Sequence, residues 1–400
     1  MLQKILQKFP VHILINKAFC EIAMTIYVVT PGDTVDSIAS ANGVTPASII
    51  YNNQLVYPYG LTAGQALLLT LPDFSYERQI RSGGYAYPFI NDWVLEQSLP
   101  YLSDLYVFSY GFTPEGELIP PWADDSGLIA AAKAAGTAPI LTLTPFDVNG
   151  QFNNYLITTL INNPGAVDNL IANLTRQIQT AGFQGVDIDF EFILPEDRIA
   201  FADFVRQVRE AINTLGYPVS VALAPKTSDD QPGLLYEAKD YALLGEAANY
   251  VLLMTYEWGY TYGPPMAVAP LNQVRRVVEY ALTRIPAEKI HLGIPNYGYD
   301  WTLPFERGVS MARTLGNVEA MQLAVSYGVP IEFDETAASP FFRYETGGLS
   351  HQVWFEDVRS LEAKFGLVNE YGLRGIGIWQ IMQLFRAGYL LLADRFRIQK

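Results

Sequence analysis

The sequence predicts an α/β protein in which a small β-α-α-β domain precedes a (β/α)8 TIM barrel. Three observations predict this fold class. Residues 27–72 contain no Lys, Arg, His or Glu and follow a strand, helix, helix, strand pattern. From residue 78 onward, apolar strand-like runs alternate with helical patterns, which is typical of parallel βαβ units. One of these runs, 185–191, carries carboxylates at alternate positions.

Composition narrows the classes of function. The 400-residue chain has a formal net charge of −15, which argues against nucleic acid and anionic membranes as partners but not against a neutral glycan. The single cysteine, Cys20, excludes an intramolecular disulfide. Because His12, His291 and His351 are far apart in sequence, no metal and no other cofactor is expected. We also expect a monomer.

The first 25 residues predict an irregular or helical extension rather than a targeting segment. The apolar run at 11–15 is interrupted by Asn16 and Lys17, whereas a secretory signal needs about 7–15 consecutive apolar residues. The run is also too short to span a membrane. No convincing signal peptide is therefore expected, and Met24 is an alternative start.

The predicted small domain occupies residues 26–72. Residues 26–29 predict its first strand, and the Pro31-Gly32 turn follows. Thr34 is a suitable N-cap for the first helix, and Thr45-Pro46 begins the second. Residues 66–71 predict the second strand.

Several segments of this domain resemble the LysM family. They are Tyr27-Val28-Val29, Pro31-Gly32-Asp33-Thr34, Ile38-Ala39, Asn52-Asn53 and Leu61-Thr62-Ala63-Gly64-Gln65. The resemblance implies binding of peptidoglycan, chitin or another N-acetylglucosamine polymer. It places the sugar in a groove between Gly32, Asp33 and Thr34 on one side and the loop that begins at Asn53 on the other. The alternative is that these residues only shape a small core.

The second domain is expected over residues 78–400. Its eight strands are predicted at 80–87, 105–110, 139–144, 185–191, 219–224, 250–256, 290–295 and 375–379. The helices between them include 125–135, 162–181, 195–215, 236–248 and 267–284. A doubly wound sheet is less suitable, because Ser82-Gly83-Gly84 lacks the G-x-G-x-x-G form. The long seventh connection predicts a small α+β insertion at about 300–360, with strands at 329–333, 341–344 and 351–355.

The acidic run has two faces, because successive side chains on a strand point to opposite sides. One face is apolar and is expected to pack under the outer helices: Val186, Ile188 and Phe190. The other is acidic and is expected to face the barrel interior: Asp187, Asp189 and Glu191. Like charges so close raise the pKa of a carboxyl, which suits a general acid. A structural role would need basic partners, and the strand supplies none.

Residues 78–395 resemble glycoside hydrolase family 18. The acidic run matches the D-x-x-D-x-D-x-E signature, with Gln184 in place of the first Asp. Met254-Thr255-Tyr256-Glu257 resembles the Met-x-Tyr-Asp element, with Glu257 in place of Asp, and Trp379 resembles the closing tryptophan. The Ser-x-Gly-Gly element of strand three is not evident at 141–145.

This resemblance implies a retaining, substrate-assisted reaction, outside the usual two-carboxylate scheme. Glu191 would protonate the glycosidic oxygen and later activate water. Asp189 would orient the substrate acetamide, Asp187 would tune Asp189, and Tyr256 would donate its hydroxyl to the acetamide carbonyl. The substrate-binding residues of the barrel would be Trp379, Glu257, Met254 and Tyr85.

The combination of LysM and this barrel resembles the spore cortex-lytic N-acetylglucosaminidases of endospore-forming bacteria. Further similar segments are 223–227, 230–237 and 255–260. The expected function is hydrolysis of β-1,4 bonds at N-acetylglucosamine in peptidoglycan, in the spore cortex or coat or at the cell wall. Two alternatives remain: a chitinase, and a non-catalytic glycan-binding spore protein.

Overall fold

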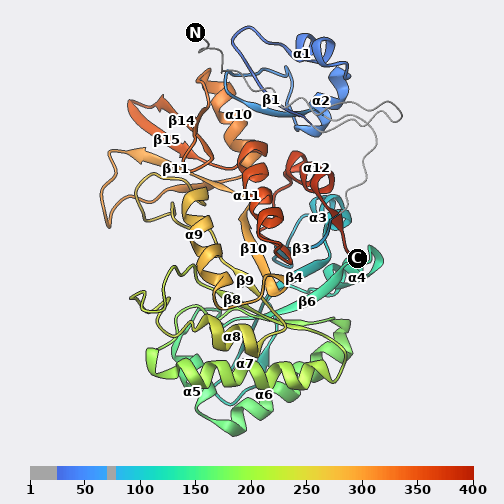
Figure 1. Cartoon of the computed structure of the whole chain (residues 1–400), viewed down its shortest axis with the longest axis vertical. Coiled ribbons are helices and arrows are strands. Elements are labelled where there is room, and N and C mark those ends of the chain that lie inside the picture. Colours follow the sequence, from blue (N-terminus) through green and yellow to red (C-terminus); the bar gives the residue numbers. More distant parts are fainter. Residues whose placement is uncertain (1–24, 70–77) are drawn as a thin grey trace, which may run out of the picture.

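The structure, a computed structural model, describes residues 25–69 and 78–400 (Figure 1). The extension expected at residues 1–25 lies outside the described residues except for Thr25, which begins the first strand. No helix within the described ranges is both long and apolar enough to cross a membrane.

The described part of the chain forms a closed barrel of eight parallel strands. They are β3 (Gln79–Ala86), β4 (Asp104–Phe112), β6 (Ala138–Leu143), β7 (Val186–Ile188), β8 (Val219–Leu223), β9 (Tyr250–Leu253), β10 (Ile290–Pro295) and β16 (Gly375–Trp379). Each strand pairs with the next in this order, and β3 pairs with both β16 and β4, which closes the ring. The predicted (β/α)8 architecture is confirmed.

Helices surround the barrel in the expected alternation. They are α3 (Asp92–Ser98), α4 (Ser126–Ala134), α5 (Tyr155–Ile161), α6 (Pro164–Gln177), α7 (Arg198–Asn213), α8 (Tyr241–Ala247), α9 (Leu271–Leu282), α11 (Val358–Glu370) and α12 (Arg386–Arg395). The apolar face of β7 packs outward, as its alternation predicts. Phe190 stacks on Phe201 and Phe204 of α7, with ring centroids 5.8 and 5.7 Å apart.

The seventh connection contains a separate five-stranded sheet. Its strands are β11 (Gly298–Leu303), β12 (Arg313–Leu315), β13 (Glu332–Asp334), β14 (Ser339–Thr346) and β15 (Leu349–Trp354), in the order β12-β11-β15-β14-β13, with helix α10 (Asn317–Tyr327). Three strands were predicted here. The prediction missed β11 and β12, because only two residues separate β11 from the end of the buried barrel strand β10. Two short strands also extend the barrel sheet: β5 (Leu118–Ile119) beside β4 and β17 (Arg397–Ile398) beside β3.

The N-terminal β-α-α-β unit has its own small core. It consists of β1 (Thr25–Val28), α1 (Val35–Asn42), α2 (Pro46–Asn52) and β2 (Ala66–Leu69), with β1 and β2 antiparallel. Thr34 caps α1 in a capping box with Ser37, as its position predicts. The apolar residues Ile38, Ile49 and Leu67 lie at its centre.

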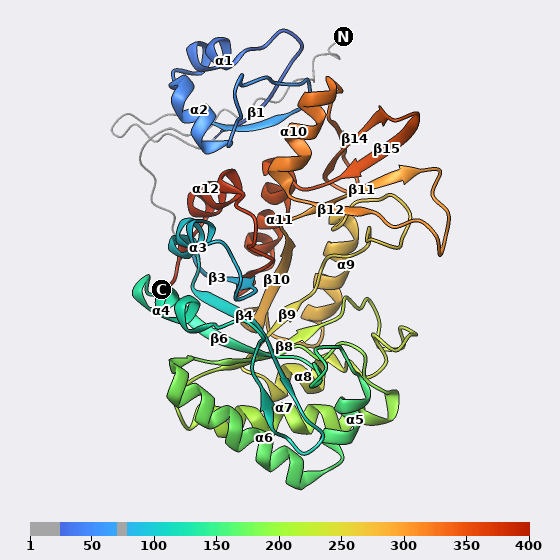
Figure 2. The same cartoon turned by 180° about the vertical axis from the view of Figure 1, so that it is seen from behind.

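This unit is fixed to the barrel side of the molecule, near α10 and α12 (Figures 1 and 2). The guanidinium of Arg386 lies 4.0 Å from the ring centroid of Tyr51, and one of its nitrogens donates to the Tyr51 carbonyl at 3.0 Å. The Arg386 backbone N–H donates to the Gln54 side chain at 2.6 Å. Arg386 is only 9% exposed, so its guanidinium has lost most of its contact with water. The Tyr51 ring and carbonyl compensate for that loss.

Replacing Arg386 with Ala should loosen this attachment. The change removes the cation–π stack on Tyr51 and leaves the Tyr51 carbonyl without its donor, at a cost of about 1–3 kcal/mol. Hydrogen exchange should therefore become faster in α2 but not in the barrel strands. Arg343→Ala is the matched control, since that exposed arginine lies 5.9 Å from the Phe341 ring and far from α2 in sequence. Unchanged protection of α2 in Arg386→Ala would contradict the attachment.

Candidate active site

A pocket of about 250 Å³ opens at the carboxyl ends of the barrel strands. Barrel enzymes place their reactive groups at this end, because loops of several strands converge there. Its lining combines three carboxylates with a large apolar surface: Tyr87, Phe108, Phe152, Asp189, Glu191, Pro225, Leu235, Met254, Tyr256, Glu257 and Trp379. The acidic run and the segments around residues 254–257 and 379, predicted separately from the sequence, therefore meet in one cavity.

Asp187 is the deepest member of the acidic row and lies fully buried on β7. Ser220 donates to one of its oxygens at 2.6 Å, and Tyr85 donates to the other at 2.9 Å. Burial raises the pKa of Asp187 to about 6, while these two hydroxyl hydrogen bonds lower it. Both oxygens are thus occupied by the protein, so Asp187 acts on its neighbours rather than on a ligand.

Asp189 and Glu191 follow Asp187 toward the pocket. Burial raises the pKa of Asp189 well above its usual range, and the charges of Glu191 and Asp187 raise it further. Burial also raises the pKa of Glu191. One buried oxygen of Asp189 accepts no hydrogen bond from any described residue. This oxygen is an acceptor without a donor at the wall of the pocket.

A buried lysine balances the acidic row, and the sequence analysis missed it. Lys239 is 1% exposed and lies in the loop before α8. Its ammonium donates to the carbonyls of Phe190 and Ala222 and lies 5.2 Å from the Phe201 ring centroid. Burial lowers the pKa of Lys239 to about 8, and the three carboxylates oppose that shift. The lysine in turn lowers the pKa of each carboxyl.

Tyr256 presents its ring to the same pocket just beyond β9. It is 8% exposed, and burial raises the pKa of its hydroxyl well above the usual value, so the hydroxyl stays protonated and can donate. A β-carbon at position 293 would lie 2.8 Å from this ring and 2.3 Å from the Leu253 carbonyl. The absence of a side chain at Gly293 therefore provides the space that the Tyr256 ring occupies.

Trp379 forms an aromatic wall at the end of β16. Its ring centroid lies 4.9 Å from that of Phe108, 5.6 Å from Tyr85 and 6.4 Å from Tyr87, with the rings edge to face. Such contacts fix the indole orientation while leaving part of it exposed to the pocket. A flat apolar wall beside carboxylates suits a ligand with one apolar face and several polar groups.

Glu257 lies at the rim and is positioned by the inserted sheet. One of its oxygens accepts hydrogen bonds from Tyr297 and from Tyr299, the latter at 2.9 Å. Its backbone has φ of +68°, a left-handed conformation that is costly for a residue other than glycine. The two tyrosines follow β10 and were not recognised in the sequence, because nothing in that segment indicates that it turns back toward residue 257.

Comparison with known proteins identifies the fold that carries this site. The model of glycosyl hydrolases family 18 matches residues 146–383, more than half of the chain. The chain belongs to glycosyl hydrolase family 18. The LysM domain model matches residues 27–70.

Relatives of this family 18 enzyme include proteins of spore-forming bacteria. The cortical fragment-lytic enzyme of Bacillus subtilis (strain 168) is 34% identical over 430 aligned positions, covering 94% of this chain and 99% of that protein. The crystal structure of the spore cortex-lytic enzyme SleL of Bacillus cereus superposes with a TM-score of 0.90 at 32% identity, covering 95% and 99%. A chitinase from Chromobacterium violaceum ATCC 12472 superposes with a TM-score of 0.73 at 25% identity, covering 79% and 98%.

One predicted substrate-binding residue of the barrel has a different place. Tyr85 is 2% exposed, its ring stacks on Tyr106 at 4.4 Å, and its hydroxyl donates to Asp187. It does not line this pocket, and a direct contact of Tyr85 with sugar stays a prediction. Tyr85 is a positioning residue for the acidic row. Met254, Glu257 and Trp379 do line the pocket.

The residues predicted for the LysM groove are used within that domain. The Asp33 carboxylate accepts from the Thr30 backbone at 2.7 Å and from the Tyr27 hydroxyl at 2.9 Å. Gly32 has φ of +93° in the preceding turn, and Thr34 caps α1. A role for these three in sugar contact stays a prediction.

Asn53, the fourth groove residue, braces the LysM core. Its amide nitrogen donates to the Ile49 and Leu68 carbonyls at 2.9 and 3.0 Å, and its oxygen accepts from the Leu68 N–H at 2.7 Å. At 5% exposure this amide is already satisfied within the domain, and a role for Asn53 in sugar contact stays a prediction. Among the described residues, no group of three or more His, Cys, Asp or Glu is placed to hold a metal ion.

Replacing Asp189 with Asn should stabilise this enzyme near neutral pH. A carboxyl whose pKa is raised in the folded state contributes stability that is complete below its ordinary value of about 3.9 and is lost as pH rises through the folded pKa. The unfolding temperature of Asp189→Asn should therefore exceed that of the parent at about pH 7, with a smaller difference at about pH 4. Asp168→Asn, at an exposed position of α6, is the control. An equal difference at both pH values would exclude a raised pKa at Asp189.

Proposed function

We propose that this family 18 enzyme hydrolyses β-1,4 bonds at N-acetylglucosamine in peptidoglycan, with the spore cortex as its substrate. The observation that carries the proposal is the buried Asp189 oxygen without a donor, in a pocket shared with Glu191, Tyr256 and Trp379. The printed functions of the Bacillus relatives, which align over nearly their whole length, support the same substrate. They also support a location in the spore or at the cell wall.

The pocket is suited to a substrate-assisted, retaining reaction. The N–H of a substrate acetamide supplies the donor that the free Asp189 oxygen lacks, and the Tyr256 hydroxyl donates to the acetamide carbonyl. That carbonyl attacks the anomeric carbon while Glu191 protonates the leaving oxygen. Water, activated by Glu191, then opens the resulting oxazolinium ion.

The electrostatics of the row support these roles. The raised pKa of Glu191 favours the protonated form that a general acid requires. Asp187, held by Ser220 and Tyr85, raises the pKa of Asp189 through its charge. Developing positive charge on the sugar would favour the ionised form of Asp189. Trp379 supplies the apolar surface beneath the ring, and Glu257 and Met254 border the bound sugar.

Replacing Glu191 with Gln should lower turnover of cortex fragments by about 10²–10⁴-fold, which is the usual contribution of a general acid–base group. Glycan binding should persist, because the amide keeps the shape of the carboxyl. Glu196→Gln is the control, since Glu196 is exposed and does not line the pocket. Equal turnover in Glu191→Gln and the parent would remove Glu191 from this role. Binding without turnover in the parent protein would favour the non-catalytic alternative.

Product analysis distinguishes peptidoglycan from chitin. The parent enzyme is incubated separately with cortex fragments and with chitin oligomers, and new reducing ends are identified by mass spectrometry. We expect N-acetylglucosamine reducing ends from the cortex fragments. Release from chitin alone would contradict the peptidoglycan proposal and favour the chitinase alternative. The structural similarity to a chitinase at 25% identity is the reason for testing that alternative.

A further inference from the structure

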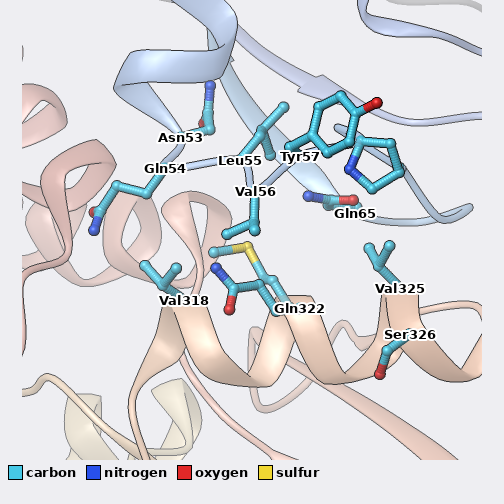
Figure 3. Close-up of a pocket in the computed structure, with 13 residues that line it drawn as sticks. Asn53, Gln54, Leu55, Val56, Tyr57, Gln65, Val318, Gln322, Val325 and Ser326 are labelled. Atoms are coloured by element: carbon cyan, nitrogen blue, oxygen red, sulfur yellow. The ribbon is translucent and has the colours of Figure 1, made fainter.

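A second cavity, of about 420 Å³, lies between the LysM domain and helix α10 of the inserted unit (Figure 3). The loop after α2 forms one wall, and one face of α10 forms the other. The lining residues from the LysM side are Asn53, Gln54, Leu55, Val56, Tyr57, Pro58, Gly60 and Gln65, and those from α10 are Val318, Met321, Gln322, Val325 and Ser326. The active-site pocket shares none of these residues.

The lining has a distinct chemical character. It contains no charged side chain, although the chain has 26 Lys and Arg and 41 Asp and Glu residues. Both walls supply apolar surface and side-chain amides. Tyr57 is 80% exposed and Val56 is 60% exposed, so these apolar groups face solvent at the opening. The cavity therefore fits an uncharged ligand that combines apolar groups with amide or hydroxyl groups.

Gln65 indicates what such a ligand must provide. It is 2% exposed, and its side-chain oxygen accepts from the Thr62 N–H at 3.2 Å. Its amide nitrogen finds no acceptor among the residues that the structure describes, and it lies at the wall of the cavity (Figure 3). That nitrogen is not fully buried, so a ligand in the cavity can reach it. A ligand carbonyl oxygen would satisfy it.

Helix α10 presents a second amide from the opposite wall. Gln322 is exposed and lies below Val56, between Val318 and Val325, and its side chain makes no hydrogen bond to the described protein (Figure 3). An exposed amide offers both a donor and an acceptor to a ligand in the cavity. The two glutamines thus face one space from two different domains.

The walls are held in a fixed relation. Thr62 donates to the Val329 carbonyl at 2.7 Å, and the Ile331 N–H donates to the Ala63 carbonyl at 2.8 Å. Gln54, in the wall itself, adopts φ of +53° and donates to the Leu384 carbonyl at 3.1 Å. A left-handed residue that surrounding contacts hold in place is a feature of preorganised binding sites.

We propose that this cavity is a second glycan site, formed jointly by the LysM loop and α10, which takes an N-acetylated sugar unit of the polymer. The acetamido group supplies a carbonyl for the Gln65 amide, a methyl for the valine and methionine side chains, and an N–H for the Gln322 oxygen. The site shares the loop that begins at Asn53 with the groove expected in the LysM domain, but its other wall is α10, and Gly32, Asp33 and Thr34 do not line it. The identity of the polymer rests on the proposed function.

Methyl NMR tests both sites in one titration. Met321 lines this cavity and Met254 lines the active-site pocket, so ¹³C-methyl-methionine labelling gives each site its own reporter. The protein carries Glu191→Gln to prevent turnover, and the probe is the β-1,4-linked trisaccharide of N-acetylglucosamine. Met321→Leu and Met254→Leu assign the two signals. We expect both signals to shift and to saturate.

Variants of Gln322 then test the cavity itself. Gln322→Trp fills it from an exposed position and should raise the trisaccharide concentration needed for the Met321 shift by at least about tenfold. Gln322→Ala, which keeps the space and removes the amide, should raise it less. Gln179→Trp is the control, because this glutamine is exposed and lies two residues after α6, a helix at the other end of the molecule from the LysM domain (Figure 1).

The outcomes separate this inference from the proposed function. A saturating shift of Met254 with no shift of Met321 would overturn the second site and leave the proposed function intact. A shift of Met321 with the sugar-free peptide stem of peptidoglycan, and none with the trisaccharide, would overturn it in favour of a peptide site. The absence of both shifts would count against the proposed substrate and this site together.

Discussion

The rest of the structure depends on the electrostatic balance around three carboxylates on one face of β7. Asp187, Asp189 and Glu191 all have raised pKa values, mainly through burial, so the fold holds them at a cost. One buried cation, Lys239, opposes that cost. Its ammonium hydrogen-bonds to carbonyls and not to the carboxylates, so it lowers their pKa values through space without occupying their oxygens. The Asp189 and Glu191 carboxylates consequently remain available to a ligand.

Hydrogen bonding divides the row into different tasks. The oxygens of Asp187 are both taken by Ser220 and Tyr85, which fixes that carboxyl as a charge at the base of the site. Asp189 keeps one oxygen without a donor, and Glu191 reaches the pocket beyond the end of the strand. Strand alternation alone makes the three equivalent. The residues that distinguish them are Ser220 on β8, which pairs with β7, and Tyr85 on β3, a strand of the same closed barrel that does not pair with β7.

The features of this site that depend on local periodicity could be predicted from the sequence. The outward set Val186, Ile188 and Phe190 and the barrel order followed from alternation and from the helix and strand patterns. The role of Lys239 could not be predicted in this way, because it lies in a loop whose sequence has no periodicity. Only the closed barrel brings its ammonium within hydrogen-bond distance of the Phe190 carbonyl. Nothing in the sequence indicates that the Asn53 amide braces the LysM core, because its partners Ile49 and Leu68 lie on two different elements of that domain.

Because the LysM domain is attached beside it, the inserted unit contributes to two sites. Tyr299 on β11 and Tyr297 just before it hydrogen-bond to Glu257 at the rim of the active site, while helix α10 faces the LysM loop. The inserted unit thus borders both cavities. A domain on a flexible tether raises the local concentration of polymer without fixing its direction, whereas a docked one also fixes the direction. The hydrogen bonds from Thr62 and Ile331 and the buried Arg386 stack hold the LysM domain in the docked arrangement. A glycan strand bound in the cavity between the LysM loop and α10 would therefore extend from that cavity in a direction that the fold determines.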